Sequence, residues 1–205
     1  MEEVVFRAYV TNLGMYNEGY LVGEWVDFPI SHEKDLEIKK AINKMLCRIG
    51  VDGVLYEEYF ITDYESDIEG LVDCFGEYEN LLLLHYLACK IQKMDNVKQF
   101  ESMIAYGEMT GSVEELINLT ENADCFYFMS NVEDDYDLGY EYVENSGVWM
   151  ESLGNLANYI DYKSYGYDIR TIEGGIHTKN GYISLIDDMR TFFHSDKDEI
   201  PKEYL

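Results

Sequence analysis

An excess of acidic residues is the feature that most constrains how this chain can fold. The sequence holds 41 Asp and Glu against 15 Lys and Arg, which gives 205 residues a formal net charge of −26. Such a charge opposes compaction through self-repulsion. Because 47% of the residues are hydrophobic and 15% are aromatic, the chain still has enough apolar surface to form a core. We therefore expect a folded protein whose surface carries the acidic side chains.

The charge also narrows the classes of partner. DNA phosphates and anionic lipids should repel the chain, so we expect neither direct nucleic-acid binding nor membrane binding. No apolar run reaches the length of about 18 residues that marks a membrane helix. The acidic start, Met1–Glu3, lacks the basic region of a signal peptide, which favours a cytoplasmic location.

Four explanations of the charge remain open. They are a solubility surface, salt adaptation, multivalent metal binding and attraction to a basic partner. Salt adaptation is weakened because 11 of the 15 basic residues are lysines and because large apolar residues are abundant.

Periodicity predicts an α+β unit over residues 1–66. Val4, Phe6, Ala8 and Val10 alternate with more polar positions, which is typical of a strand with one apolar face. The further elements that we expect here are a strand over 20–28 ended by Pro29, a helix capped by Ser31 and closed by Gly50, and a strand over 54–62.

The pattern changes twice further along the chain. Residues 67–121 read as a helical domain, with helices over 68–75, 78–94 and 97–106 and a capping box at 112–115. Residues 122–205 read as a second α+β domain with an acidic helix and an extended tail. Its expected elements are a strand over 124–130, helices over 137–145 and 156–162, a hairpin turn at Asn180-Gly181, and a poorly ordered tail over 195–205. The fold class is therefore predicted as α+β, in an elongated chain of three small domains.

Motifs for metal binding and catalysis are weak. The EF-hand pattern fails at its last ligand around both Gly139 and Gly70. His85 and Cys89 stand four apart and could hold zinc, but a core helix with one buried Cys is the better interpretation. The four cysteines are dispersed and fit reduced, buried thiols.

Hydrolase and nucleotide-binding motifs are absent from the sequence, so we expect neither a metal, nor a cofactor, nor an enzyme. A glycosidase needs only two carboxylates at the right separation, so that possibility stays open. The tyrosines are expected to be half-buried packing residues with solvated hydroxyls.

Acidic residues gather in two stretches. The first contains Glu57, Glu58, Asp63, Glu65, Asp67 and Glu69, and the second contains Glu133, Asp134, Asp135, Asp137, Glu141 and Glu144. Asp137, Glu141 and Glu144 would form one line on a helix, where like charges repel. A solvated helix face explains a single line. A row of carboxylates kept despite repulsion could also replace a row of phosphates, since 26 charges correspond to about 44 Å of B-form DNA at one charge per about 1.7 Å.

Three blocks of sequence resemble ArdA-type antirestriction proteins. Val10–Gly19 (VTNLGMYNEG), continuing into Leu21–Trp25 and Phe28-Pro29, is similar to the opening of that family, and Ile61–Glu65 (ITDYE) to the end of its first unit. Asn158–Asp168 (NYIDYKSYGYD), which adds Asp161 and Asp168 to the candidate residues, is similar to the segment after the family's antirestriction region. That region falls near 133–144.

The resemblance implies a non-catalytic homodimer that imitates bent B-form DNA and is carried by mobile elements. It would occupy the DNA site of type I restriction-modification enzymes, on the modification core and the specificity subunit. The alternative is an acidic module that binds another basic DNA-binding protein. On the first hypothesis the carboxylates of the two acidic stretches, together with Asp161 and Asp168, stand in for phosphates.

Overall fold

The computed structural model describes residues 4–31, 37–145, 154–194 and 200–204. The chain divides into two compact units. The first comprises residues 1–95, 109–120 and 191–205, and the second comprises 96–108 and 121–190. The expected division into three domains stays a prediction, although one helix of the middle region, α4, groups with the second unit and its neighbours α3 and α5 group with the first.

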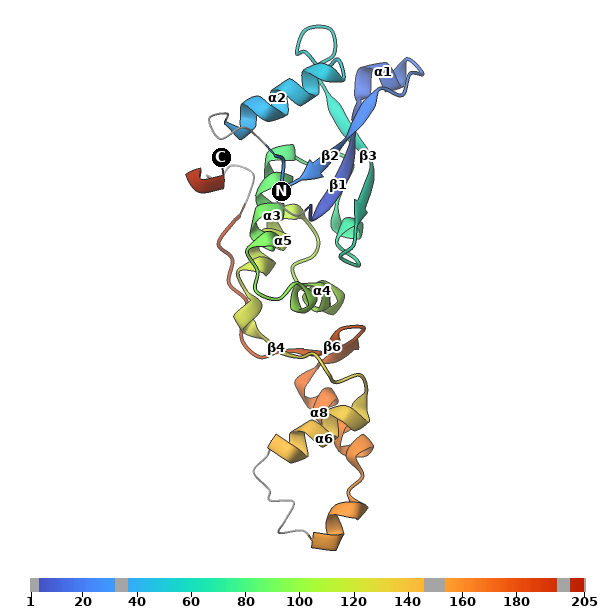
Figure 1. Ribbon diagram of the computed structural model, residues 1–205, viewed down its shortest axis with the longest axis vertical. Helices are drawn as coiled ribbons and strands as arrows, with labels where there is room; N and C mark the ends of the chain where they lie inside the picture. The colour runs from blue at the N-terminus through green and yellow to red at the C-terminus, as the bar shows by residue number, and fades with distance from the viewer. Residues whose placement is uncertain (1–3, 32–36, 146–153, 195–199, 205) are drawn as a thin grey trace. The chain divides into compact units, whose positions relative to one another are not determined.

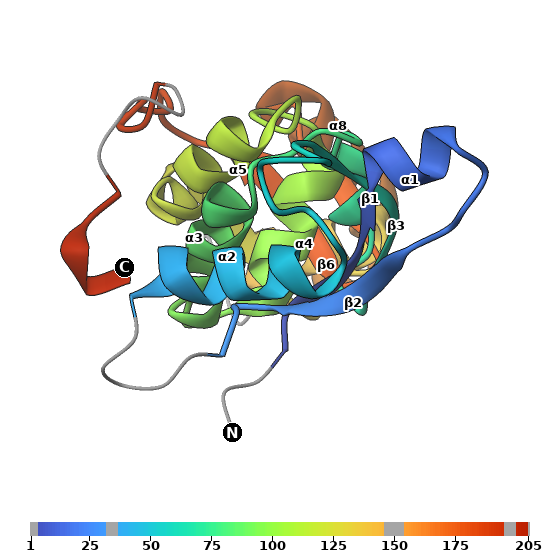
Figure 2. The same cartoon turned by 90° about the horizontal axis from the view of Figure 1, so that it is seen from above.

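A three-stranded antiparallel sheet organises the first unit. Its strands, in the order β2-β1-β3, are β1 (Phe6–Asn12), β2 (Gly23–Phe28) and β3 (Tyr59–Ser66). The short helix α1 (Leu13–Asn17) follows β1, and α2 (Ile38–Arg48) and α3 (Leu81–Gln92) lie on one side of the sheet (Figures 1 and 2). The predicted apolar face of β1 is confirmed at Phe6, Ala8 and Val10, which are at most 1% exposed, but not at Val4, which precedes the strand and is 47% exposed.

Two expected elements of the first unit are displaced. The third strand begins at Tyr59 rather than Val54, because the Asp52 carboxylate accepts hydrogen bonds from the amides of Val54 and Leu55 and closes a turn there. The helix predicted after Ser31 begins only at Ile38, with Glu37 at its N-cap. Its end was predicted correctly, since Gly50 follows the helix with φ +81°.

The helices of the middle region are partly as predicted. Residues 68–75 form only a short 3-10 helix, Val72–Cys74, because Gly70 adopts φ +79° and interrupts the turn. The next helix, α3, is shorter than expected and begins after Asn80, whose side chain caps the Leu82 amide. The bounds of α4 (Val97–Tyr106) match the prediction.

The capping box at 112–115 forms in a modified way ahead of α5 (Val113–Thr120). The Ser112 hydroxyl accepts from the Glu115 amide, but the Glu115 carboxylate accepts from the Gly111 amide, one residue before the expected position.

Part of the C-terminal segment packs on the first unit, contrary to the expectation of a poorly ordered tail. Ile200 and Tyr204 are 9% exposed, and Tyr204 lies in the short 3-10 helix Lys202–Tyr204. Its ring lies 4.8 Å from the Tyr86 ring, and Lys93 Nζ lies 3.9 Å above it. Residues 195–199 and 205 lie outside the described ranges.

The second unit contains a smaller antiparallel sheet with the order β4-β6-β5. Its strands are β4 (Phe126–Met129), β5 (Ile176–Thr178) and β6 (Gly181–Leu185), and a short 3-10 helix, Ala123–Cys125, precedes β4. The predicted hairpin is confirmed, since Thr178 pairs with Gly181 across the turn. The Ser102 hydroxyl of α4 lies 2.8 Å from the Thr178 hydroxyl, which ties that helix to the sheet.

Two helices complete the second unit and lie side by side (Figure 1). α6 (Asp135–Asn145) is the predicted acidic helix and begins two residues earlier than expected. The helix expected over 156–162 is instead a 3-10 helix, Gly154–Tyr159, followed by the unpredicted α8 (Tyr162–Glu173). A local signal for α8 existed, because the Asp161 side chain caps the Ser164 amide.

The cysteines are free, as expected, but not all are buried. Cys47 is exposed, Cys74 and Cys89 are half-buried, and Cys125 is buried. In the four ranges that the structure describes, no helix has the length and apolar character to cross a membrane.

Candidate functional site

The first stretch of acidic residues lies on the surface of the first unit. Glu57, Glu58, Asp63, Glu65, Asp67 and Glu69 are all exposed. Asp63 and Glu65 belong to β3, where they pair with Tyr9 and Arg7 of β1. Because side chains alternate along a strand, these residues occupy the face of the sheet opposite the core.

Arg7 is at the centre of this outer sheet face. Its Nε donates to Asp27 Oδ1 at 2.6 Å, and its Nη1 lies 3.6 Å from Glu65 Oε2. The guanidinium also lies 5.5 Å from the centre of the Trp25 ring. One cation therefore serves two carboxylates, and these groups leave an excess negative charge on the sheet.

The second stretch surrounds the start of α6. Asp134 Oδ1 accepts from the amides of Tyr136 and Asp137, and Asp137 Oδ2 accepts from the Glu133 amide. Negative charge at a helix N-terminus is favourable, so these carboxylates have a structural role as well as a charge. Glu133 and Asp134 are exposed, and Asp137 is half-buried.

The C-terminal end of α6 also carries acidic residues, but there the helix dipole disfavours them. Glu141 is half-buried and accepts from Asn145 Nδ2 at 3.2 Å, and Glu144 is exposed in the last turn. That turn carries no basic residue. Because the C-terminal end of a helix is partially negative, Glu144 opposes the helix dipole. Acidic residues kept against local stability are typical of a binding surface.

Asp135 differs from its neighbours because it has internal cationic partners. Arg170 Nε donates to its Oδ1 at 2.7 Å and Arg170 Nη2 to its Oδ2 at 3.3 Å, while His177 Nε2 lies 2.9 Å from Oδ1. The Asp135 side chain is 17% exposed. The hydrogen bonds from Arg170 lower the pKa of the Asp135 carboxyl to about 2, and His177 adds to the effect. Asp135 therefore joins α6 to α8 and β5.

The last two candidates lie on or next to α8. Asp161 caps the helix, accepting from the Ser164 amide at 3.0 Å and the Ser164 hydroxyl at 2.8 Å. These bonds lower the pKa of Asp161, with the amide contribution the larger. Asp168 is exposed. Between positions 133 and 173 the sequence has ten acidic and two basic residues, and one of the two, Arg170, is paired with Asp135.

The family of the chain follows from comparison with protein-family models. The model described as antirestriction protein (ArdA) matches residues 8–184. The chain belongs to the ArdA family of antirestriction proteins. No curated protein matches this ArdA family member in sequence. The match spans both units and includes every candidate carboxylate.

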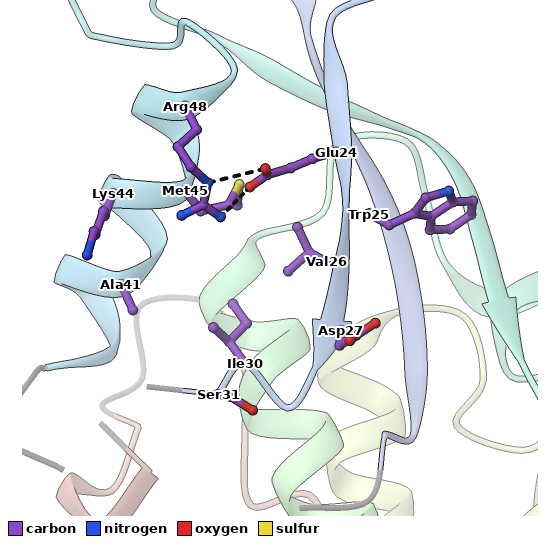
Figure 3. Close-up of a pocket in the computed structure, with 10 residues that line it drawn as sticks. All are labelled: Glu24, Trp25, Val26, Asp27, Ile30, Ser31, Ala41, Lys44, Met45 and Arg48. Carbon is purple, nitrogen blue, oxygen red and sulfur yellow. Dashed lines mark hydrogen bonds and ion pairs between the residues drawn. The ribbon is translucent and has the colours of Figure 1, made fainter. Parts of the chain in front are cut away.

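A hollow of about 320 Å³ in the first unit of this ArdA family member lies between β2 and α2 (Figure 3). Glu24 faces α2 and pairs with Arg48, whereas Trp25 points to the other side of β2 (Figure 3). The second acidic residue of the lining, Asp27, is paired with Arg7. Each of these two carboxylates is therefore paired with an arginine.

The possible zinc pair has a structural role. His85 Nδ1 accepts from the Ile30 amide at 3.0 Å, and His85 Nε2 lies 3.5 Å from Cys89 Sγ. Within the described ranges, no three His, Cys, Asp or Glu side chains gather where they could hold a metal ion.

Sequence reasoning located the acidic stretches of this ArdA family member but not their internal contacts. The candidate residues divide between the two units, with Glu57 to Glu69 in the first and Glu133 to Asp168 in the second. The ion pair between Asp135 and Arg170 joins residues that are 35 positions apart in the sequence, so no local sequence pattern predicts it. The same is true of the tyrosines that surround Glu141, which lie on three separate elements.

Proposed function

We propose that this ArdA family member inhibits type I restriction-modification enzymes by occupying their DNA-binding groove as a non-catalytic mimic of B-form DNA. Exposed carboxylates on β3, on α6 and at α8 take the place of phosphates. They pair with Lys and Arg on the modification core and the specificity subunit. Asp135 is excluded from this set, because its charge is already compensated by Arg170.

One observation supports this proposal above the others. Glu144 is exposed at the C-terminal end of α6, the terminus that disfavours it, and Asp134 and Asp137 lie at the N-terminal end of the same helix. A surface selected only for solubility could place lysine at that end at no cost. Acidic side chains along the whole helix instead suit a partner that binds a line of negative charge.

A competition assay tests the proposal. A labelled duplex carrying the recognition site is bound to a type I enzyme, and the acidic protein is added in increasing amounts. We expect displacement of the duplex at a saturating excess, together with loss of both cleavage and methylation. Retention of the duplex at saturation would refute the proposal. Displacement of DNA from other basic proteins, with none from the restriction enzyme, would favour the general acidic module.

The oligomeric state is part of the same proposal. We infer a homodimer acting in the cytoplasm, because two copies double the length of charged surface that a long DNA groove can contact. Light scattering on the purified chain measures this state. A monomer at the concentrations that inhibit the enzyme would remove the dimer from the proposal.

A further inference from the structure

The second unit contains a small hollow that the acidic residues alone do not explain. Its volume is about 240 Å³, below the range of about 300–1,000 Å³ typical of small-molecule sites. The lining, which we call the tyrosine pocket, consists of Tyr127, Met129, Glu141, Tyr142, Asn145 and Tyr165. These residues come from β4, α6 and α8. The size suits one side chain better than a cofactor.

One wall of the tyrosine pocket is held rigidly. The Tyr142 hydroxyl donates to Glu173, which also accepts from the hydroxyls of Tyr182 at 2.7 Å and Ser184 at 3.3 Å. Tyr182 and Ser184 are fully buried in β6. The Tyr142 ring is therefore positioned by part-buried hydrogen bonds before any ligand arrives, which lowers the entropic cost of binding.

The remaining groups are available to a ligand. Tyr127 and Tyr165 are 40% and 42% exposed. Glu141 accepts a hydrogen bond from Asn145, and within the described ranges it forms no ion pair with a basic side chain. Aromatic faces and a carboxylate both attract a cation, so the tyrosine pocket has the chemistry of a cation site.

Two arginines of the chain itself are bound by a carboxylate together with an aromatic ring. Arg7 contacts the Asp27 carboxylate and lies over the Trp25 ring. Arg170 contacts the Asp135 carboxylate and lies 5.3 Å from the centre of the Tyr167 ring. In the tyrosine pocket the carboxylate and the rings are present without the guanidinium.

We propose that the tyrosine pocket receives an arginine side chain of the partner protein. The proposal rests on the proposed function, because a DNA-binding groove supplies arginines that normally contact phosphates. A planar guanidinium can stack on a tyrosine ring and at the same time pair with Glu141, which a lysine ammonium does less well. The carboxylates of the surface resemble DNA phosphates. The tyrosine pocket adds contacts with aromatic rings, which DNA phosphates do not offer.

Binding of a single arginine tests the pocket without the restriction enzyme. The full chain, with ¹³C-labelled tyrosine rings, is titrated with N-acetylarginine amide and monitored by NMR. We expect saturable shifts of the Tyr127 and Tyr165 ring signals, with weaker binding of N-acetyllysine amide. Equal binding of the two amides, or shifts no larger than those of Tyr136, would overturn the assignment.

Variants separate the pocket from the general negative charge. Glu141→Gln and Tyr165→Ala should each weaken arginine amide binding roughly two- to thirty-fold. Tyr165→Phe keeps the ring and should retain binding. Asp188→Asn and Tyr136→Ala remove the same kinds of group at exposed positions outside the pocket and should leave binding unchanged. Equal effects in these controls would refute the pocket.

The same variants distinguish failure of the pocket from failure of the proposed function. If the wild-type chain displaces DNA from the enzyme and Tyr165→Ala does so equally well, the pocket is wrong and DNA mimicry stands. If arginine amide binds the pocket and the chain never displaces DNA, the proposed function is wrong. Weaker displacement by Tyr165→Ala, restored by Tyr165→Phe, supports both.

Discussion

Gly139 of α6 and Gly166 of α8 face each other where the two helices cross. A Cβ atom on Gly139 would lie 1.9 Å from the Tyr162 carbonyl oxygen, and one on Gly166 would lie 1.8 Å from the Asp135 carbonyl oxygen. The obstructing atoms are backbone and cannot move aside without moving a helix. The two glycines therefore set the spacing between α8 and α6, the helix that carries most of the second acidic stretch.

Replacing either glycine should separate these helices. We expect Gly139→Ala and Gly166→Ala each to lower the free energy of unfolding by about 2–3 kcal/mol, the upper part of the usual range for overpacking. Thermal or urea unfolding followed by circular dichroism measures the change. Gly111→Ala is the matched control, because its added methyl meets only the end of the Glu115 side chain. A loss as large in Gly111→Ala would show that the close contact is not the cause.

The ion pair of Asp135 predicts a pH dependence of stability. Its pKa is about 2 in the folded protein and about 3.8 when unperturbed, so the unfolded chain binds a proton first as the pH falls. The stabilisation is therefore complete above about pH 4 and is lost as the pH falls through about 2. Asp135→Asn should cost about 1–2 kcal/mol at neutral pH.

Urea unfolding of the wild type and of Asp135→Asn between pH 2 and pH 7 measures this dependence. The difference in unfolding free energy should shrink toward zero at the acid end. A difference that stays constant down to pH 2 would contradict the assigned pairing with Arg170.

Charge neutralisation tests the acidic line on α6. Replacing Asp134, Asp137, Glu141 and Glu144 together by their amides should weaken inhibition of a type I enzyme by about 1–3 kcal/mol, roughly five- to 150-fold. Each single replacement should have a small effect, because exposed ion pairs are weak individually. The control with equal loss of charge replaces Asp95, Glu108, Asp187 and Asp188, which are exposed outside the proposed surface. Equal loss of inhibition in both variants would show that total charge alone matters.

Salt should weaken the inhibition. Pairs between exposed carboxylates and basic groups are screened as the Debye length falls from about 10 Å at 0.1 M to about 3 Å at 1 M. The inhibition constant, measured from 0.05 to 0.5 M salt, should rise steadily, and the slope should be smaller for the fourfold α6 variant. Inhibition that does not depend on salt would be incompatible with phosphate mimicry.

Asn118 should be important for the C-terminal segment of the first unit. Its side chain is 2% exposed, donates to the Phe193 carbonyl at 2.6 Å and accepts from the amides of Phe192 and Phe193 at 2.8 Å. Asn118→Ala removes these hydrogen bonds from buried and part-buried backbone groups and should cost about 2–3 kcal/mol of stability. Chemical denaturation measures the loss, and the exposed residue Asn155, replaced by alanine, should change stability by less than about 0.5 kcal/mol. Comparable losses in the two variants would contradict the role of Asn118.

Local signals predicted much of the secondary structure. The hairpin at Lys179–Gly181, the end of α2 at Gly50 and the bounds of α4 depend on neighbours in the sequence. They form as expected, except that the turn itself consists of Lys179 and Asn180. The errors arose where a turn competed with an apolar run. Val54 and Leu55 resemble a strand, but their amides bind Asp52, and the two side chains are 85% and 75% exposed.

Sequence alone determined the charge, the α+β class, the acidic stretches and the family resemblance, because composition and short-range pattern are written in the order of residues. Only the tertiary structure decided which carboxylates are free and which are paired. Asp135 meets Arg170 and His177, and Tyr165 and Glu141 come to line one hollow, only after α6, α8 and the small sheet have packed together. Contacts between residues distant in the chain depend on the packing of whole elements, which no local spacing records.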